Sequence, residues 1–253
     1  VRGGTKQIAV PAGKLRALLA TLALRMNRTV SIDELAEMVW EDVRPVDSRS
    51  TLQKYVMRLR RLLGDTDAAI RTEPNGYRLE LPPEQSDLGR FTWLVEEGKR
   101  VARSGDSALA SERLTEAVEL WCDIPPLANV ETTRLHTDEV PLLVERYLEA
   151  VEMRIDADLA LGRHRDVSAE LLGLLRSHPL RERFWAQRMR ALSASGRRGE
   201  ALAAYREVAA LLADELGIEP GPELKSVHRM ILRAEGSDIA GAHLATRPHE
   251  PIA

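Results

Sequence analysis

The sequence predicts a mainly α-helical protein with a small β component. Apolar residues recur at helical spacing along most of the 253 residues, and one strong hairpin signal, Pro74-Asn75-Gly76, interrupts them. Aromatic residues make up only 4% of the chain, so a core has to be built from Leu, Val and Ala, which favours packed helices. The length suits one to three domains.

Two helices are predicted before residue 41. The first spans about residues 13–26, with one apolar stripe formed by Leu15, Leu18, Leu19 and Leu22. Ser31 is expected to cap the second helix, residues 32–40, and Glu34 to complete a capping box. Ahead of them, a Gly3-Gly4 turn between strand-like pieces predicts a short hairpin, and the start at Val1 suggests a fragment.

A third helix is predicted over residues 48–64, SRSTLQKYVMRLRRLLG, with Asp47 or Ser48 as its cap. It carries five basic side chains and no acid. One face is apolar: Leu52, Val56, Leu59 and Leu63. The opposite face is polar and includes Met57: Ser50, Lys54, Arg58 and Arg61. Because a solvated helix usually mixes charges of both signs, this pattern favours contact with nucleic acid over contact with solvent alone.

Residues 70–81, IRTEPNGYRLEL, predict two short strands around the turn, where Asn-Gly would supply positive φ values. Three helices followed by a hairpin are the layout of a winged helix-turn-helix. In that fold the third helix enters the major groove of DNA, and the hairpin is the wing that reaches the backbone or the minor groove.

The candidate DNA-binding residues follow from this layout. In the recognition helix they are Arg49, Ser50, Thr51, Gln53, Lys54, Arg58 and Arg61; in the wing they are Arg71 and Arg78. Arg and Lys can donate to guanine and Gln to adenine, while hydroxyls and first-turn N–H groups can donate to phosphate. A solvated strand face is the alternative for the two wing arginines, and Tyr77 is expected to pack the wing against the helices. Arg60 lies at the flank of the basic face.

The two segments of the chain differ in net charge. Residues 1–86 hold 14 Lys and Arg against 11 Asp and Glu, a net charge of +3, while the remainder carries −6. Only the first segment is therefore expected to approach phosphate.

The remaining chain predicts an all-α, tetratricopeptide-like domain over residues 87–235, after a linker at Pro82-Pro83. Gly162-Arg163 and Gly196-Arg197 are 34 residues apart, the period of the tetratricopeptide hairpin. Small residues after them, Ala169 and Ala203, are expected to let paired helices approach closely. Residues 236–253 show no helical period and predict a flexible tail or linker.

Residues 5–82 resemble the OmpR-type winged helix of the Streptomyces antibiotic regulatory protein family. The resemblance rests on VSIDELAEMVW, Pro45, STLQKYVMRLRRLLG and the wing residues Gly76 to Leu79; the family's N-terminal strand is only partly represented. GEALAAYREVAALLADELGIEPGPEL (199–224) resembles the end of the bacterial transcriptional activator domain, which follows the winged helix in that family. No P-loop follows, so the chain is expected to be a short member or the N-terminal part of a larger regulator.

The resemblance implies a transcription activator of antibiotic genes. Its members bind direct-repeat promoter sites on double-stranded DNA as head-to-tail protomers, expected here as a homodimer, and contact the sigma and alpha subunits of RNA polymerase. A repressor and a protein-interaction scaffold remain alternatives. The fold is the same in an activator and a repressor, and a scaffold would not explain an acid-free basic helix face.

Motifs of enzymes and metal sites are missing from the sequence. The single Cys122 fits a reducing compartment, and the six histidines have no partners at metal-ligand spacing. A nucleophile elbow, an HExxH motif and an apolar run of membrane-spanning length are absent. We therefore expect a cytoplasmic bacterial protein, nucleoid-associated when bound to DNA, that is not an enzyme and has no cofactor.

Overall fold

The computed structural model of the chain describes residues 2–3, 6–7, 9–41, 43–64, 66, 68–121 and 125–243. The chain forms two compact units, each made of two segments. The first unit contains residues 1–100 and 112–151, and the second contains residues 101–111 and 152–253. These units divide the chain at other places than the predicted boundary at residues 82–87, which remains a proposal about sequence modules.

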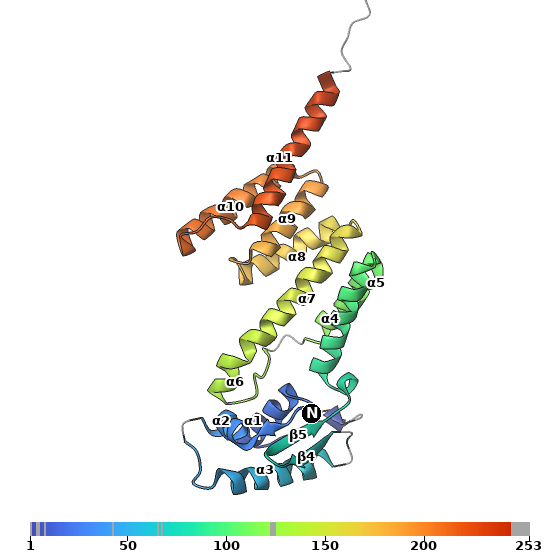
Figure 1. Cartoon of the computed structure of the whole chain (residues 1–253). Coiled ribbons are helices and arrows are strands. Elements are labelled where there is room, and N and C mark those ends of the chain that lie inside the picture. Colours follow the sequence, from blue (N-terminus) through green and yellow to red (C-terminus); the bar gives the residue numbers. More distant parts are fainter. Residues whose placement is uncertain are drawn as a thin grey trace, which may run out of the picture. The chain divides into compact units, whose positions relative to one another are not determined.

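The first unit begins with a short hairpin and then forms the three-helix layout that the sequence predicts (Figure 1). Its elements are β1 (Arg2–Gly3), β2 (Lys6–Gln7), α1 (Gly13–Leu24), β3 (Val30–Ser31), α2 (Ile32–Trp40), α3 (Ser48–Leu63), β4 (Ala69–Glu73) and β5 (Gly76–Glu80). Strands β3, β5 and β4 form an antiparallel sheet in that spatial order. The predicted apolar stripes of α1 and α3 are buried in one core with Tyr77 and Leu79 of the wing.

The start of α2 confirms the Ser31 half of the predicted capping box, whereas the Glu34 half is not formed. The Ser31 hydroxyl accepts a hydrogen bond from the Glu34 N–H at 3.1 Å, as an N-cap requires. The Glu34 carboxylate instead lies 3.3 Å from Nε of Arg25, the C-cap residue of α1. An ion-pair partner from a neighbouring helix thus replaces the local backbone partner.

The wing turn forms at the predicted place, but its backbone dihedral angles differ from those predicted. Glu73 pairs with Gly76 in the strand register, so the two-residue turn is Pro74-Asn75. Neither Asn75 nor Gly76 has a positive φ. The prediction that Asn-Gly supplies positive φ values to this turn is therefore wrong. Gly76 is needed for a close approach instead, because a Cβ there would come within 1.9 Å of the Val30 carbonyl oxygen.

Helical residues that follow the wing complete the core of the first unit. A 3₁₀ turn (Pro83–Gln85) leads into α4 (Asp87–Arg103) and α5 (Ser107–Glu119); α6 (Thr133–Asp138) and α7 (Val140–Ala160) come later. Val130 and Leu135 are 5% and 0% exposed and belong to the same core cluster as α1, α2 and α3. The winged helix is therefore closed by side chains that lie some fifty residues beyond it in sequence.

Polar contacts fasten the same segment to the winged helix. Arg134 lies 2.6 Å from Glu37 of α2, and the Arg134 backbone N–H donates to the Glu41 carboxylate at 3.0 Å. Glu41, at the end of α2, has φ +53° and ψ −117°, a conformation that residues with a side chain rarely adopt. Its carboxylate satisfies a first-turn N–H of α6, so this strained residue joins the end of α2 to the start of α6.

The second unit contains the predicted helical repeats. Its helices are α8 (His164–Ser177), α9 (Glu182–Ala194), α10 (Arg198–Leu216) and α11 (Pro222–His243), and α9 packs against the other three. Gly162 and Gly196 have φ of +78° and +75° and form equivalent turns before α8 and α10. This equivalence supports the predicted period of 34 residues.

Two details of the second unit differ from the sequence-based expectations. Ala169 and Ala203 are exposed, and the positions buried one period apart are Val167 and Ala201. Helix α11 extends to His243, past the boundary predicted at residue 236, because isolated glycines such as Gly236 and Gly241 weaken a helix without ending it. Residues 244–253 of the predicted tail lie outside the described residues, and so does Cys122.

Candidate nucleic-acid interface

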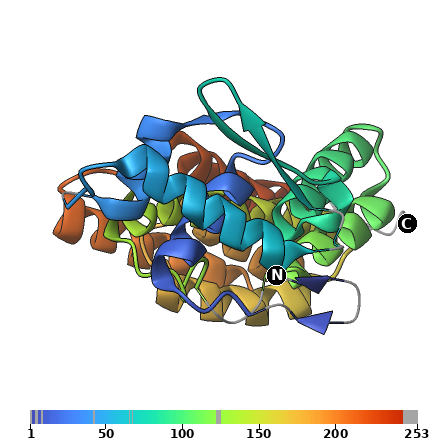
Figure 2. The ribbon, with the colours of Figure 1, turned by 90° about the horizontal axis from the view of Figure 1, so that it is seen from below.

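Helix α3 places the basic side chains on a face turned away from the core. Its four buried residues are those of the predicted apolar stripe, and Asp47 and Gly64 define its two ends. Five predicted DNA-binding residues are exposed: Arg49, Gln53, Lys54, Arg58 and Arg61; Ser50 and Thr51 are half-buried. Seen from below, α3 runs across the near side of the first unit, and none of that unit's other ribbons lies in front of it (Figure 2).

The cations of this face differ from other arginines of the chain in their lack of acidic partners. Within the described part of the chain, Arg49, Lys54, Arg58 and Arg61 form no salt bridge. By contrast, Arg16, Arg100 and Arg197 each lie within 3.0 Å of a carboxylate. The α3 face therefore carries four positive charges that are available to an anion.

Two first-turn groups of α3 that were expected to donate to phosphate are hydrogen-bonded to Asp47. Asp47 is the cap: its carboxylate accepts the Ser50 N–H at 2.9 Å, and its carbonyl accepts the Thr51 hydroxyl at 2.9 Å. The Ser50 N–H and the Thr51 hydroxyl are thus both engaged within the protein. The side chains of Arg49 and Ser50 are the candidate phosphate donors that remain at this end.

Arg60 has a function that the sequence did not indicate. Its guanidinium donates from Nε to the Ile70 carbonyl at 2.9 Å and from Nη2 to the Thr72 hydroxyl at 2.8 Å. Both acceptors are on β4, so Arg60 sets the position of the wing against α3. Sequence spacing contains no signal for this contact, because it depends on how β4 packs beside the helix.

Arg60→Ala and Arg61→Ala are expected to separate these two roles. Losing the contacts to Ile70 and Thr72 should lower the free energy of unfolding by about 1 kcal/mol and speed amide exchange in β4. Arg61→Ala, its matched neighbour, should weaken DNA binding while leaving stability within about 0.5 kcal/mol of the parent. Urea unfolding measures the stability of both variants, and hydrogen exchange measures the opening of β4. Equal stabilities for the two variants would show that Arg60 does not hold the wing against α3.

The two wing arginines lie directly opposite each other in the strand register but are each paired with acid. Arg71 contacts Glu80 at 2.8 Å, and Arg78 contacts Glu73 at 2.9 Å and Glu80 at 3.0 Å. The hydrogen bond from Arg71, helped by both guanidinium charges, holds the pKa of the Glu80 carboxyl below its ordinary value. The wing therefore presents positive charge balanced by two carboxylates, unlike α3.

A metal site and a membrane-spanning helix have no support in the described residues. Their His, Cys, Asp and Glu side chains form no group of three that could hold a metal ion. None of the helices described is long and apolar enough to cross a membrane. The acid-free face of α3 is accordingly the strongest candidate interface of the first unit.

Comparison with known proteins matches both parts of the chain to families of regulators. Residues 9–79 match the family described as transcriptional regulatory protein, C terminal, and residues 86–232 match the bacterial transcriptional activator domain. The regulatory protein DnrI of Streptomyces peucetius is 36% identical over 88% of this chain and 85% of its own length. The regulatory protein AfsR of Streptomyces coelicolor is 37% identical over 90% of this chain and 23% of its own length.

A solved structure shares the architecture. The transcriptional regulatory protein EmbR of Mycobacterium tuberculosis is 38% identical over 90% of this chain and 60% of its own length. The structure of EmbR in complex with a low-affinity phosphopeptide superposes with a TM-score of 0.85, at 37% identity over 89% of this chain and 61% of that one. The chain thus spans about three fifths of the length of this relative.

Proposed function

The chain belongs to the Streptomyces antibiotic regulatory protein family, in which an OmpR-type winged helix precedes a bacterial transcriptional activator domain, and we propose that it is a sequence-specific DNA-binding activator of transcription. The observation that carries the proposal is the exposed face of α3, with four cations that have no acidic partner among the described residues. Such a face matches the charge of the DNA backbone.

The face also contains side chains that could distinguish bases. Lys54 and Arg58 lie one helical turn apart and are both exposed, so both can point into a major groove and donate to guanine O6 and N7. Gln53, beside them, suits adenine. We assign Arg49, Ser50 and Arg61 to phosphate, and Thr51 becomes a phosphate donor only if its hydroxyl leaves the Asp47 carbonyl.

The wing is assigned a secondary role. Arg71 and Arg78 can reach phosphate or the minor groove only by sharing or breaking their ion pairs with Glu73 and Glu80. Exposed ion pairs of this kind are weak, typically below about 1 kcal/mol, so exchange of a carboxylate for a phosphate is feasible. The wing should then contribute less to affinity than α3.

The finer features rest on the family. We propose binding to direct-repeat promoter sites by a homodimer formed on DNA, contact with the sigma and alpha subunits of RNA polymerase, and control of antibiotic genes. The setting would be the bacterial cytoplasm and nucleoid. Both matched regions belong to regulator families, which supports a role without catalysis. Footprinting on genomic fragments would give the repeat spacing and the position relative to the promoter together.

The salt dependence of binding tests the electrostatic part of the proposal. If each protomer neutralises about four phosphates, log K should fall by roughly 3 to 4 for each tenfold increase in salt, because each contact releases a counterion. Fluorescence anisotropy with a footprinted site, from about 50 to 300 mM salt, measures this slope. A scrambled duplex of equal length is the control, and absence of binding to any promoter fragment at low salt would refute the proposal.

A further inference from the structure

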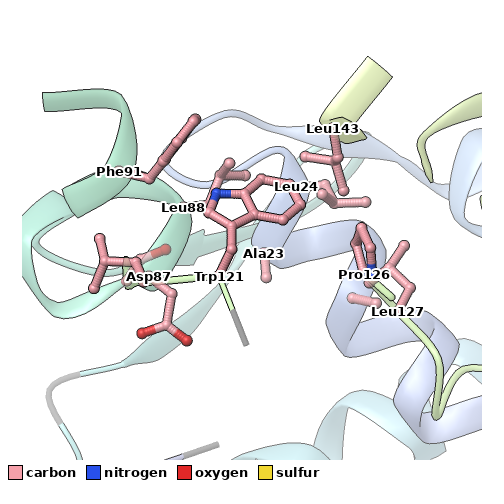
Figure 3. Close-up of a pocket in the computed structure, with 12 residues that line it drawn as sticks. Ala23, Leu24, Asp87, Leu88, Phe91, Trp121, Pro126, Leu127 and Leu143 are labelled. Atoms are coloured by element: carbon pink, nitrogen blue, oxygen red, sulfur yellow. The ribbon is translucent and has the colours of Figure 1, made fainter. Parts of the chain in front are cut away.

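We propose that the first unit contains a binding site for a small, neutral aromatic molecule bearing a carbonyl group, a role beyond DNA binding. The site is a cavity of about 300 Å³, at the small end of the range for ligand sites. Its wall is formed by α1, the start of α4, the residues just after α5, the turn at Pro126-Leu127 and the start of α7 (Figure 3).

The lining is mostly apolar and aromatic, with Ser86 and Asp87 as its polar side chains. Leu24, Leu88, Leu143 and the rings of Phe91 and Trp121 surround the space, as Figure 3 shows. Apolar walls of this kind lack dispersion partners, so they favour an apolar aromatic occupant. Filling it recovers contacts that the protein alone does not make.

The aromatic wall is held in place by its own neighbours. The Trp121 ring meets Phe91 edge-on at 5.5 Å between centroids and lies 5.0 Å from the Tyr147 ring. Phe91 is only 2% exposed. A flat ligand would therefore bind against a preformed surface and would not have to order it, which favours affinity.

Polar groups in the cavity select the ligand further. The Trp121 side chain is half-buried, and its indole nitrogen faces Leu88 in Figure 3. The Ser86 hydroxyl is already engaged, accepting the Gly89 N–H at 3.2 Å. A carbonyl oxygen on the ligand could accept from the indole N–H in place of water, and the charged residue of the described lining is Asp87, whose carboxylate disfavours an anionic ligand.

Calorimetric titration of the full chain with three probes of one ring system tests the site. The probes are 1-acetonaphthone, with a carbonyl acceptor, naphthalene, without one, and 1-naphthoate, which is anionic. We expect 1-acetonaphthone to bind most tightly, by about two- to tenfold over naphthalene, the range of one net hydrogen bond. No heat with any probe, or preference for the anion, would overturn the proposal.

Two variants localise the binding. Trp121→Phe removes the N–H and part of the ring wall, so it should weaken the binding of both neutral probes, and that of 1-acetonaphthone by about two- to tenfold more than that of naphthalene. Ala23→Phe, or the smaller change Ala20→Leu if that variant does not fold, should fill the space and weaken all neutral probes at least about tenfold. Equal loss for both probes in Trp121→Phe, or undiminished binding in a folded filled variant, would refute the site.

Discussion

Replacing Lys54 and Arg58 together by alanine should nearly abolish specific DNA binding while leaving the fold intact. Each side chain is exposed on α3 and lacks an acidic partner among the described residues, so its removal leaves no buried group unpaired. If both contact bases, each change costs about 1–3 kcal/mol of specific binding free energy, and the pair, with additive costs, reduces the specific association constant by roughly 30-fold to 25,000-fold.

Anisotropy titrations on a footprinted site and on a scrambled duplex separate the two kinds of contact. Loss on the specific site alone identifies base contacts, whereas equal loss on both duplexes identifies phosphate contacts. Arg165→Ala, an exposed arginine of α8, is the matched control for lost charge and should change neither affinity. Parental affinity in both single variants would contradict the assignment of α3 as the recognition helix.

Leu135→Ala should destabilise the winged helix although it lies outside the predicted DNA-binding module. Leu135 is fully buried in the core that contains the apolar stripes of α1 and α3. Truncating such a leucine removes its transfer free energy and leaves a cavity, so the expected loss is about 2–5 kcal/mol in the free energy of unfolding. Leu142→Ala, at a 62% exposed leucine of α7, is the matched control and should change little.

Hydrogen exchange followed by mass spectrometry localises this effect. Peptides from α1 to α3 should exchange faster in Leu135→Ala, and peptides from α8 to α10 in the second unit should exchange as in the parent. Faster exchange confined to α6 and α7 would show that the shared core does not support the winged helix. The expected result would mean that the segment after α5 helps to fix the orientation of α3 in the first unit.

This shared core gives the two modules a physical connection. The Glu41 carboxylate holds the Arg134 N–H, and Arg25 pairs with Glu139 at 2.6 Å, so α1 and the end of α2 are both tied to the segment around α6. A displacement of α6 would therefore also displace the segment that leads into α3. A separable DNA-binding module, as the sequence resemblance suggests, is then an incomplete description of the first unit.

The sequence by itself determined the elements of this protein. Local signals were sufficient for the three helices, the Ser31 cap, the Gly64 stop and the glycine turns before α8 and α10, because caps, stops and periodicity act over a few residues. The same periodicity separated the buried leucines of α3 from its exposed cations, and so predicted the candidate interface residue by residue.

Tertiary structure alone decided which charges have partners and what closes the core. Arg60 binds β4, Glu34 turns to Arg25, and the wing arginines meet carboxylates across the strands, all contacts between side chains and segments brought together by packing. The burial of Leu135 beneath a winged helix fifty residues away belongs to the same class. Spacing along one element does not encode such contacts, because they depend on the distance and angle between elements after folding.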